Sequence, residues 1–108
     1  MNITPDENQF HKRQIALLRE MVTSFKRELE EAGVREEAIY DLTGSLAFSV
    51  GAILDGSRVM ECDGKPLIPY LAFAENSDRK TLLIDPNGSR LHECANGVTD
   101  EVFSDDAA

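Results

Sequence analysis

The sequence has few cysteines and no long hydrophobic run, and each scarcity excludes a class of protein. No apolar stretch approaches the roughly 18 residues that a membrane-spanning helix needs, and the opening segment MNITPDENQF lacks the basic-then-apolar layout of a signal peptide. We therefore expect a cytoplasmic protein. Thiols are normally reduced in that compartment, so Cys62 and Cys94 are expected to be free thiols rather than a disulfide.

Basic residues are also scarce. The 108 residues include 11 lysines and arginines against 20 aspartates and glutamates, which gives a formal net charge of -9 at pH 7. This charge repels phosphate backbones and anionic lipid headgroups, so we predict no direct binding to nucleic acid or to membranes. It keeps a small protein soluble, and it favours a basic protein partner where there is one.

Signatures of catalysis are missing as well. There is no Walker phosphate loop, and no pair of acids stands at a recognisable catalytic spacing. His92 and Cys94 in LHEC would share one face of a strand, as zinc ligands or a thiol with its base could. Two ligands are too few for zinc, and nearness in sequence does not make a nucleophile–base pair. We therefore predict no metal, no cofactor and no assigned catalytic residue; whether the protein is an enzyme stays open.

The first half of the chain has helical periodicity. A helix is predicted to begin at Thr4 and Pro5, with Glu7 completing a capping box, and to end near Ala32 before Gly33. A second helix is predicted from Arg35 or Glu36 to Asp55-Gly56. The apolar residues recur at spacings of three and four in both: Ile15, Leu18, Val22, Phe25 and Leu29, then Ile39, Leu42, Leu46, Val50 and Ile53.

Three small residues of the second predicted helix, Gly44, Ala47 and Gly51, lie close together on its surface. Each glycine costs about 1 kcal/mol of helix propensity relative to alanine. We expect a backbone to approach closely here, from the first helix, from the sheet or from a second copy of the chain.

After Gly56 the pattern changes to short runs separated by turn residues, which indicates antiparallel strands. Strands are predicted at 58–62, 67–75, 80–85 and 89–94, with turns at Asp63-Gly64 and in DPNGS. Residues 1–98 are predicted to form a single α+β domain, in which the N-terminal helical hairpin packs on a C-terminal antiparallel sheet of three or four strands. Residues 99–108 are predicted to be an acidic, flexible tail. A helix-only dimerisation module with a β appendage is the alternative architecture.

Three functions are compatible with these features. The first is a small acidic, non-enzymatic interaction or regulatory module that forms a homodimer through its helical apolar surface. Its acidic tail residues would steer a basic partner: Asp100, Glu101, Asp105 and Asp106. The second is a small-molecule-binding or enzymatic domain, with a pocket between helices and sheet that is edged by Tyr70, His92 and Cys94. The third is an acidic mimic of nucleic acid, which requires regularly spaced carboxylates, whereas those in the sequence are scattered.

Overall fold

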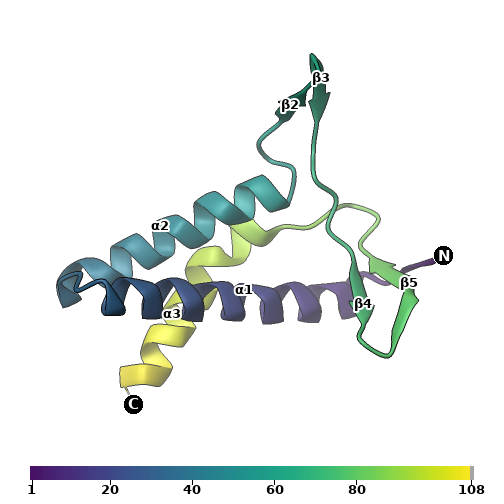
Figure 1. Ribbon diagram of the computed structural model, residues 1–108. Helices are drawn as coiled ribbons and strands as arrows, with labels where there is room; N and C mark the ends of the chain where they lie inside the picture. Colours follow the sequence, from purple (N-terminus) through teal and green to yellow (C-terminus); the bar gives the residue numbers. More distant parts are fainter. Residues whose placement is uncertain (108) are drawn as a thin grey trace.

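The computed structural model describes the backbone of residues 1–107 and the side chains of residues 1–105, and it forms an α+β domain as predicted. Figure 1 shows the arrangement of its elements. In chain order these are β1 (Asn2–Pro5), α1 (Glu7–Glu31), α2 (Glu36–Leu54), β2 (Met60–Cys62), β3 (Lys65–Leu67), β4 (Phe73–Glu75), β5 (Asp78–Ile84) and α3 (Leu91–Ala107).

The predicted helical hairpin is present, with one correction at its start. Thr4 does not cap α1, because it lies in β1; the N-cap is Asp6, whose side chain accepts a hydrogen bond of 3.0 Å from the backbone N–H of Gln9. Gly33 ends the first helix as expected, with a φ of 79° that favours glycine. The chain then turns into α2, which packs along α1.

The prediction of a fourth strand at residues 89–94 is wrong. These residues enter α3, and residues 99–107, predicted to be a flexible tail, continue that helix; Ala108 lies outside the described residues. Apolar residues recur at helical spacing along α3 and cross the predicted end of the domain at residue 98. This stripe, which was not predicted, consists of Leu91, Ala95, Val98 and Val102. Three of these residues join Leu18, Val22 and Ala47 in the buried core cluster, and Val102 packs against it. The hairpin therefore packs on a third helix and not on the sheet.

The sheet is mixed rather than antiparallel. β5 lies in its centre, paired in parallel with β1 and antiparallel with β4, while β2 and β3 form a separate two-stranded hairpin. The predicted strand 67–75 is broken, because only its ends pair; Pro69, which has no N–H to donate, lies in the gap. The sheet meets the helices at the N-terminal end of α1, where the rings of Phe10 and Phe73 lie 5.2 Å apart.

The close approach predicted at the small residues of α2 comes from an element that sequence analysis did not identify. A Cβ placed on Gly51 would lie 3.1 Å from the backbone nitrogen of His92 and 3.2 Å from the carbonyl carbon of Leu91. Gly44 faces the same helix, because its Cβ would lie 3.8 Å from the methyl group of Thr99. The glycines of α2 thus let α3 approach closely, and this packing offsets their cost in helix propensity.

Both cysteines are free thiols; Cys62 is exposed and Cys94 is half-buried. Within residues 1–107, no helix combines the length and the apolar character that crossing a bilayer requires.

Candidate functional site

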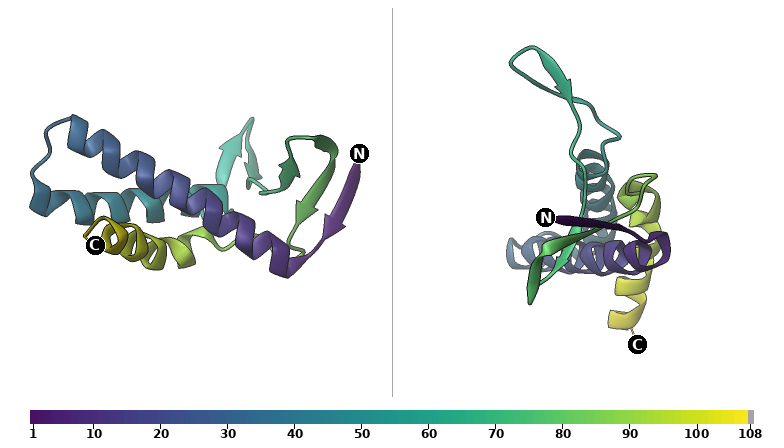
Figure 2. Two further views of the ribbon diagram at one scale, coloured as in Figure 1. Left: turned by 90° about the horizontal axis from the view of Figure 1, so that it is seen from below. Right: turned by 90° about the vertical axis from the view of Figure 1, so that its right-hand side faces the viewer.

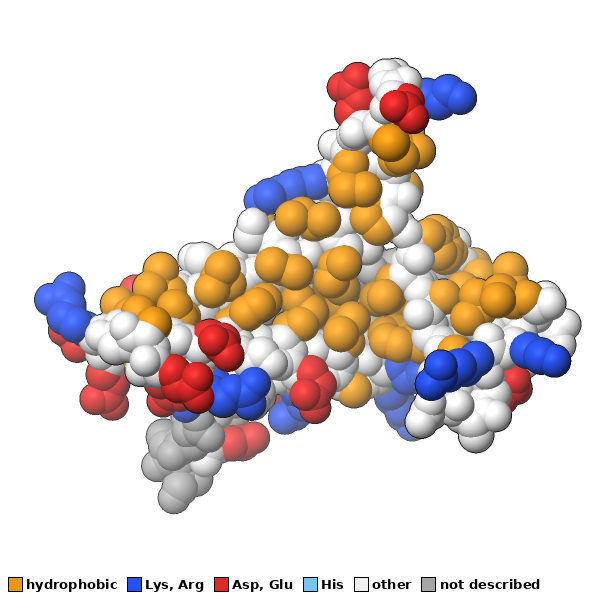
Figure 3. Space-filling view, in the orientation of Figure 1, with side chains coloured by type: hydrophobic (Ala, Val, Ile, Leu, Met, Phe, Trp, Pro, Cys, Tyr) orange, Lys and Arg blue, Asp and Glu red, His pale blue; other side chains and the backbone are white. Residues whose placement is uncertain are grey.

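The outward side of α2 is apolar where a surface helix is normally polar. Leu42 and Leu46 are 43% and 38% exposed. Val50 and Ile53 continue the same stripe at helical spacing and are half-buried. We call Leu42, Leu46, Val50 and Ile53 the α2 face. Figure 3 shows hydrophobic side chains gathered over α1 and α2 and continuing onto the base of the β2–β3 hairpin.

The segment that contains the α2 face and the β2–β3 hairpin carries little charge. Residues 42–54 contain no charged residue, and residues 42–70 contain two basic and three acidic residues. The other 79 residues contain nine basic and 17 acidic residues, so nearly all of the net charge lies elsewhere. A large exposed apolar patch with little charge is typical of a surface that associates with another molecule.

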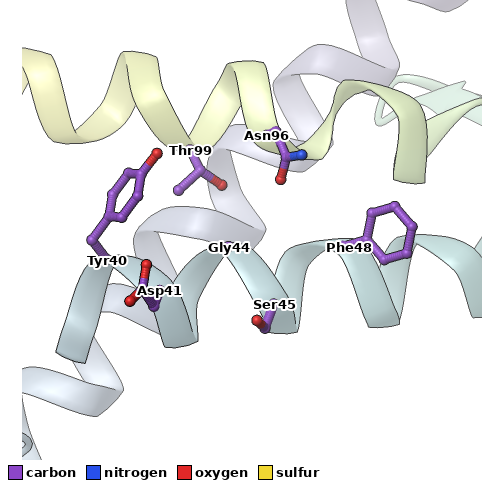
Figure 4. Close-up of a pocket in the computed structure, with 7 residues that line it drawn as sticks. All are labelled: Tyr40, Asp41, Gly44, Ser45, Phe48, Asn96 and Thr99. Atoms are coloured by element: carbon purple, nitrogen blue, oxygen red, sulfur yellow. The ribbon is translucent and has the colours of Figure 1, made fainter.

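A shallow groove of about 340 Å³ runs between α2 and α3. Figure 4 shows Tyr40 and Phe48 toward its two ends, with Asp41 and Ser45 from α2 and Asn96 from α3 between them. Tyr40 donates a hydrogen bond to the carboxylate of Asp100, which raises the pKa of the Tyr40 phenol. Among the described residues, Asp41 is the charged side chain that lines the groove, one helical turn from the Ser45 hydroxyl, and no histidine or cation accompanies it there. The groove is polar along its middle and aromatic toward its two ends.

A polar cluster joins the end of α2 to the start of α3. The buried carboxylate of Asp55 accepts a hydrogen bond of 3.1 Å from the backbone N–H of His92 and is also bonded to Nδ1 of that imidazole. The Ser57 hydroxyl lies 3.2 Å from the same Nδ1. Because both partners meet one ring nitrogen, they cannot relay a proton across the ring as a catalytic triad does. The cluster instead caps α3 with a carboxylate, which the helix dipole favours.

The three predicted pocket residues lie in different surroundings. Tyr70 donates a hydrogen bond of 2.9 Å to the backbone carbonyl of Asp85 and lines a cavity of about 220 Å³ beside Asp55. Cys94 packs against the core, and burial raises the pKa of its thiol, so it is a poor nucleophile at neutral pH. On a helix, residues two apart point in different directions, so His92 and Cys94 do not share a face.

The predicted interaction residues lie on α3. Asp100 accepts the hydrogen bond from Tyr40, and Glu101 forms an ion pair with Arg19 of α1. Asp105 lies 3.9 Å from the same guanidinium, while the side chain of Asp106 is outside the described residues. The carboxylates of Asp100, Glu101 and Asp105 thus bind α3 to the two other helices and still reach solvent.

Within the part of the chain that the structure describes, no group of three or more histidine, cysteine, aspartate or glutamate residues is placed to hold a metal ion.

Replacing Asp55 by asparagine is expected to destabilise the fold in a pH-dependent way. Burial alone would raise the pKa of Asp55, but the hydrogen bonds from His92 and Ser57 outweigh it and leave the pKa lowered. A lowered pKa means that the ionised carboxylate stabilises the folded state above about pH 4, and that this stability is lost as the pH falls through the lowered pKa. Asp55→Asn should therefore cost about 2 kcal/mol near neutral pH and progressively less in acid.

Urea unfolding of both proteins over a pH series measures this difference. A destabilisation that stays constant from neutral to acidic pH would show that the charge of Asp55 has no part in the cap.

Two features of the structure were not predicted from the sequence: the β2–β3 hairpin as a separate element and the role of Asp55. The turn of the hairpin was predicted, from the dipeptide Asp63-Gly64. Both residues adopt a positive φ in the structure, 52° and 76°, as this type of two-residue turn requires. Asp55 was interpreted as part of a helix end, and no local pattern could show that α3 begins beside it.

The comparisons with known proteins leave this geometry as the basis for any functional conclusion. No family model matches the sequence, and no curated protein and no solved structure is significantly similar to it.

Proposed function

We propose that this protein is a small cytoplasmic interaction module that acts as a homodimer, and that its copies associate through the α2 face. The observation that carries the proposal is the exposure of Leu42 and Leu46 on a helix that is apolar toward its own core as well. Apolar surface that faces water in the monomer is a source of binding free energy, at about 25 cal/mol for each Å² that association buries.

The distribution of charge favours a second copy as the occupant of this face. Two chains that each carry a net charge of -9 repel one another at most approaches. The α2 face lies in the segment that holds almost none of this charge, so it is where two copies can meet with the least repulsion. A two-fold interface also requires a surface that complements itself, and an uncharged apolar stripe does so.

The stripe suits an antiparallel pair of helices. Leu42, Leu46, Val50 and Ile53 of the α2 face are spaced by four, four and three residues, so they follow one side of the helix. In an antiparallel pair related by a two-fold axis, Leu42 of one copy lies opposite Ile53 of the other. The acidic residues of α3 lie on a different helix from this stripe and remain available to steer a basic partner toward the dimer.

Sedimentation equilibrium over a dilution series tests the proposal. The wild-type protein is expected to sediment with twice the chain mass of 12.0 kDa, and to dissociate on dilution. A single species of 12.0 kDa up to the highest soluble concentration would contradict self-association through the α2 face.

A further inference from the structure

The groove between α2 and α3 has an exposed aromatic ring toward each end, and contacts with α3 fix the orientation of both rings (Figure 4). Tyr40 donates a hydrogen bond to Asp100, and its ring packs edge-on against Phe103, with 5.2 Å between the ring centroids. Phe48 packs edge-on against the His92 imidazole at 5.5 Å. The two side chains are nevertheless 46% and 45% exposed. Because both rings are already ordered, a ligand that covers them loses little side-chain entropy on binding.

Three polar side chains lie between the rings and have no partner in the part of the chain that the structure describes. Asp41 and Ser45 of α2 and Asn96 of α3 are exposed, and none of these side chains forms a hydrogen bond or an ion pair there. Figure 4 shows the Asn96 amide directed from α3 toward α2. A carboxylate, a hydroxyl and an amide oxygen all accept hydrogen bonds, so the middle of the groove suits a group with several donors.

The two helices that form the groove carry acidic residues and no lysine or arginine. α2 contains three acidic residues and α3 contains five, so all 11 basic residues of the chain lie outside these helices. Arg19 of α1 offsets part of this charge through its ion pair with Glu101. The potential along the groove is therefore negative, which attracts a cationic occupant and repels a second copy of this acidic chain.

The length of the groove and its chemistry indicate a short basic peptide. Tyr40 and Phe48 are eight residues apart in α2, which corresponds to about 12 Å along a helix. An extended chain advances about 3.3 Å per residue, so about four residues span this distance. Arginine fits the middle of the segment, because its planar guanidinium presents several donors to a carboxylate and also stacks on aromatic rings.

We propose that the groove between α2 and α3 binds a short extended segment of a basic protein partner, with an arginine guanidinium on the carboxylate of Asp41. The aromatic rings of Tyr40 and Phe48 cover the two ends of this segment, and Ser45 and Asn96 accept hydrogen bonds from it. This inference rests on the part of the proposed function that assigns a basic partner, and it gives that partner a docking site.

The groove stays accessible in the proposed dimer, as the left-hand view of Figure 2, in which α3 lies along α2, helps to follow. Successive residues of a helix are about 100° apart around its axis, so Tyr40 and Leu42 differ by about 200°. Gly44 in the groove and Leu46 in the α2 face differ by the same angle. The groove and the α2 face therefore lie on nearly opposite sides of α2, and a second copy and a basic partner do not compete.

A titration with a short synthetic peptide tests the site. The probe is acetyl-Leu-Arg-Ala-Leu-amide, and the matched control is the same peptide with glutamine in place of arginine. In ¹H–¹⁵N correlation spectra, the arginine peptide should shift the amide resonances of Asp41, Ser45 and Asn96 along a saturable curve. The glutamine peptide should bind at least about tenfold more weakly, because it lacks the charge. Shifts that spread over the acidic surface without saturating in the groove would overturn the inference.

Paired substitutions separate the groove from the general attraction between an acidic protein and a cation. Asp41→Asn should raise the dissociation constant of the arginine peptide about fivefold, because it removes the carboxylate that the guanidinium meets. Asp63→Asn is the matched control: it removes the same charge from the exposed turn of the β2–β3 hairpin, where asparagine tolerates the positive φ. The control should stay within about twofold of the wild type. Equal weakening by both variants would show that net charge alone attracts the peptide and would overturn the inference.

Sedimentation equilibrium of the wild-type protein keeps this inference distinct from the proposed dimer. A dimer whose groove resonances do not respond to the arginine peptide would overturn this inference and leave self-association standing. A monomer that binds the peptide at Asp41 would overturn the homodimer and leave the groove site standing.

Discussion

Leu46→Glu should convert the protein from a dimer to a monomer, with a dissociation constant about 100-fold or more above that of the wild-type protein. Leu46 lies in the middle of the α2 face and is 38% exposed, so the substitution places a carboxylate where the two copies are proposed to meet. The two-fold axis brings the change into the interface twice, so two like charges are buried where the copies meet. Sedimentation equilibrium of the variant measures the shift.

The fold of the Leu46→Glu variant should be intact, because glutamate favours helices and the side chain faces outward. Thr23→Glu is the matched control: it adds the same charge at an exposed position of α1, between Arg19 and Arg27 one turn away on either side, outside the α2 face. The control should keep the wild-type dissociation constant. If both variants weakened the dimer equally, added charge would explain the loss and the α2 face would not.

Gly51→Val should destabilise the fold by about 3 kcal/mol. Even a single Cβ at this position would lie 3.1 Å from the backbone nitrogen of His92, and valine adds two further methyl groups. The start of α3 must then move away from α2, which also breaks the hydrogen bond between His92 and Asp55. Urea unfolding in the Leu46→Glu background measures the effect without a contribution from association.

Gly97→Ala is the matched control for Gly51→Val. Gly97 also lies in a helix, but a Cβ there would meet nothing within 4 Å, so alanine should stabilise the protein by about 1 kcal/mol through helix propensity alone. A Gly51→Val protein as stable as the wild type would contradict the close packing of α2 on α3.

The two long helices could be predicted from the sequence because their signals are local. The stripes of α1 and α2 are long, and Gly33 and Gly56 stand where each helix ends. α3 could not be predicted in the same way, since Gly97 interrupts its helical pattern and its first residues follow the turn sequence DPNGS, after which a strand was expected. The parallel pairing of β1 with β5 joins residues about 80 apart, and no local pattern contains such a contact.

The candidate surface could be predicted only in part. The spacing of Leu42, Leu46 and Ile53 indicates an apolar side of α2. Which apolar residues remain exposed depends on α3, which covers Ala47 and Gly51, and α3 was not predicted. The pairing of His92 with Cys94 assumed a strand, and the helix at that position separates them. The β2–β3 hairpin is separate from the larger sheet because the chain is unpaired between β3 and β4, and turn residues alone do not predict that break.

Isotope-filtered NOE spectra of a mixed sample, with one copy labelled and the other unlabelled, test the central claim most directly. We predict NOEs between the methyl groups of Leu42 in one chain and those of Ile53 in the other, since the antiparallel two-fold pairing places these side chains opposite each other. Intermolecular NOEs that involve α3 or the sheet and leave the α2 face without any would contradict the account.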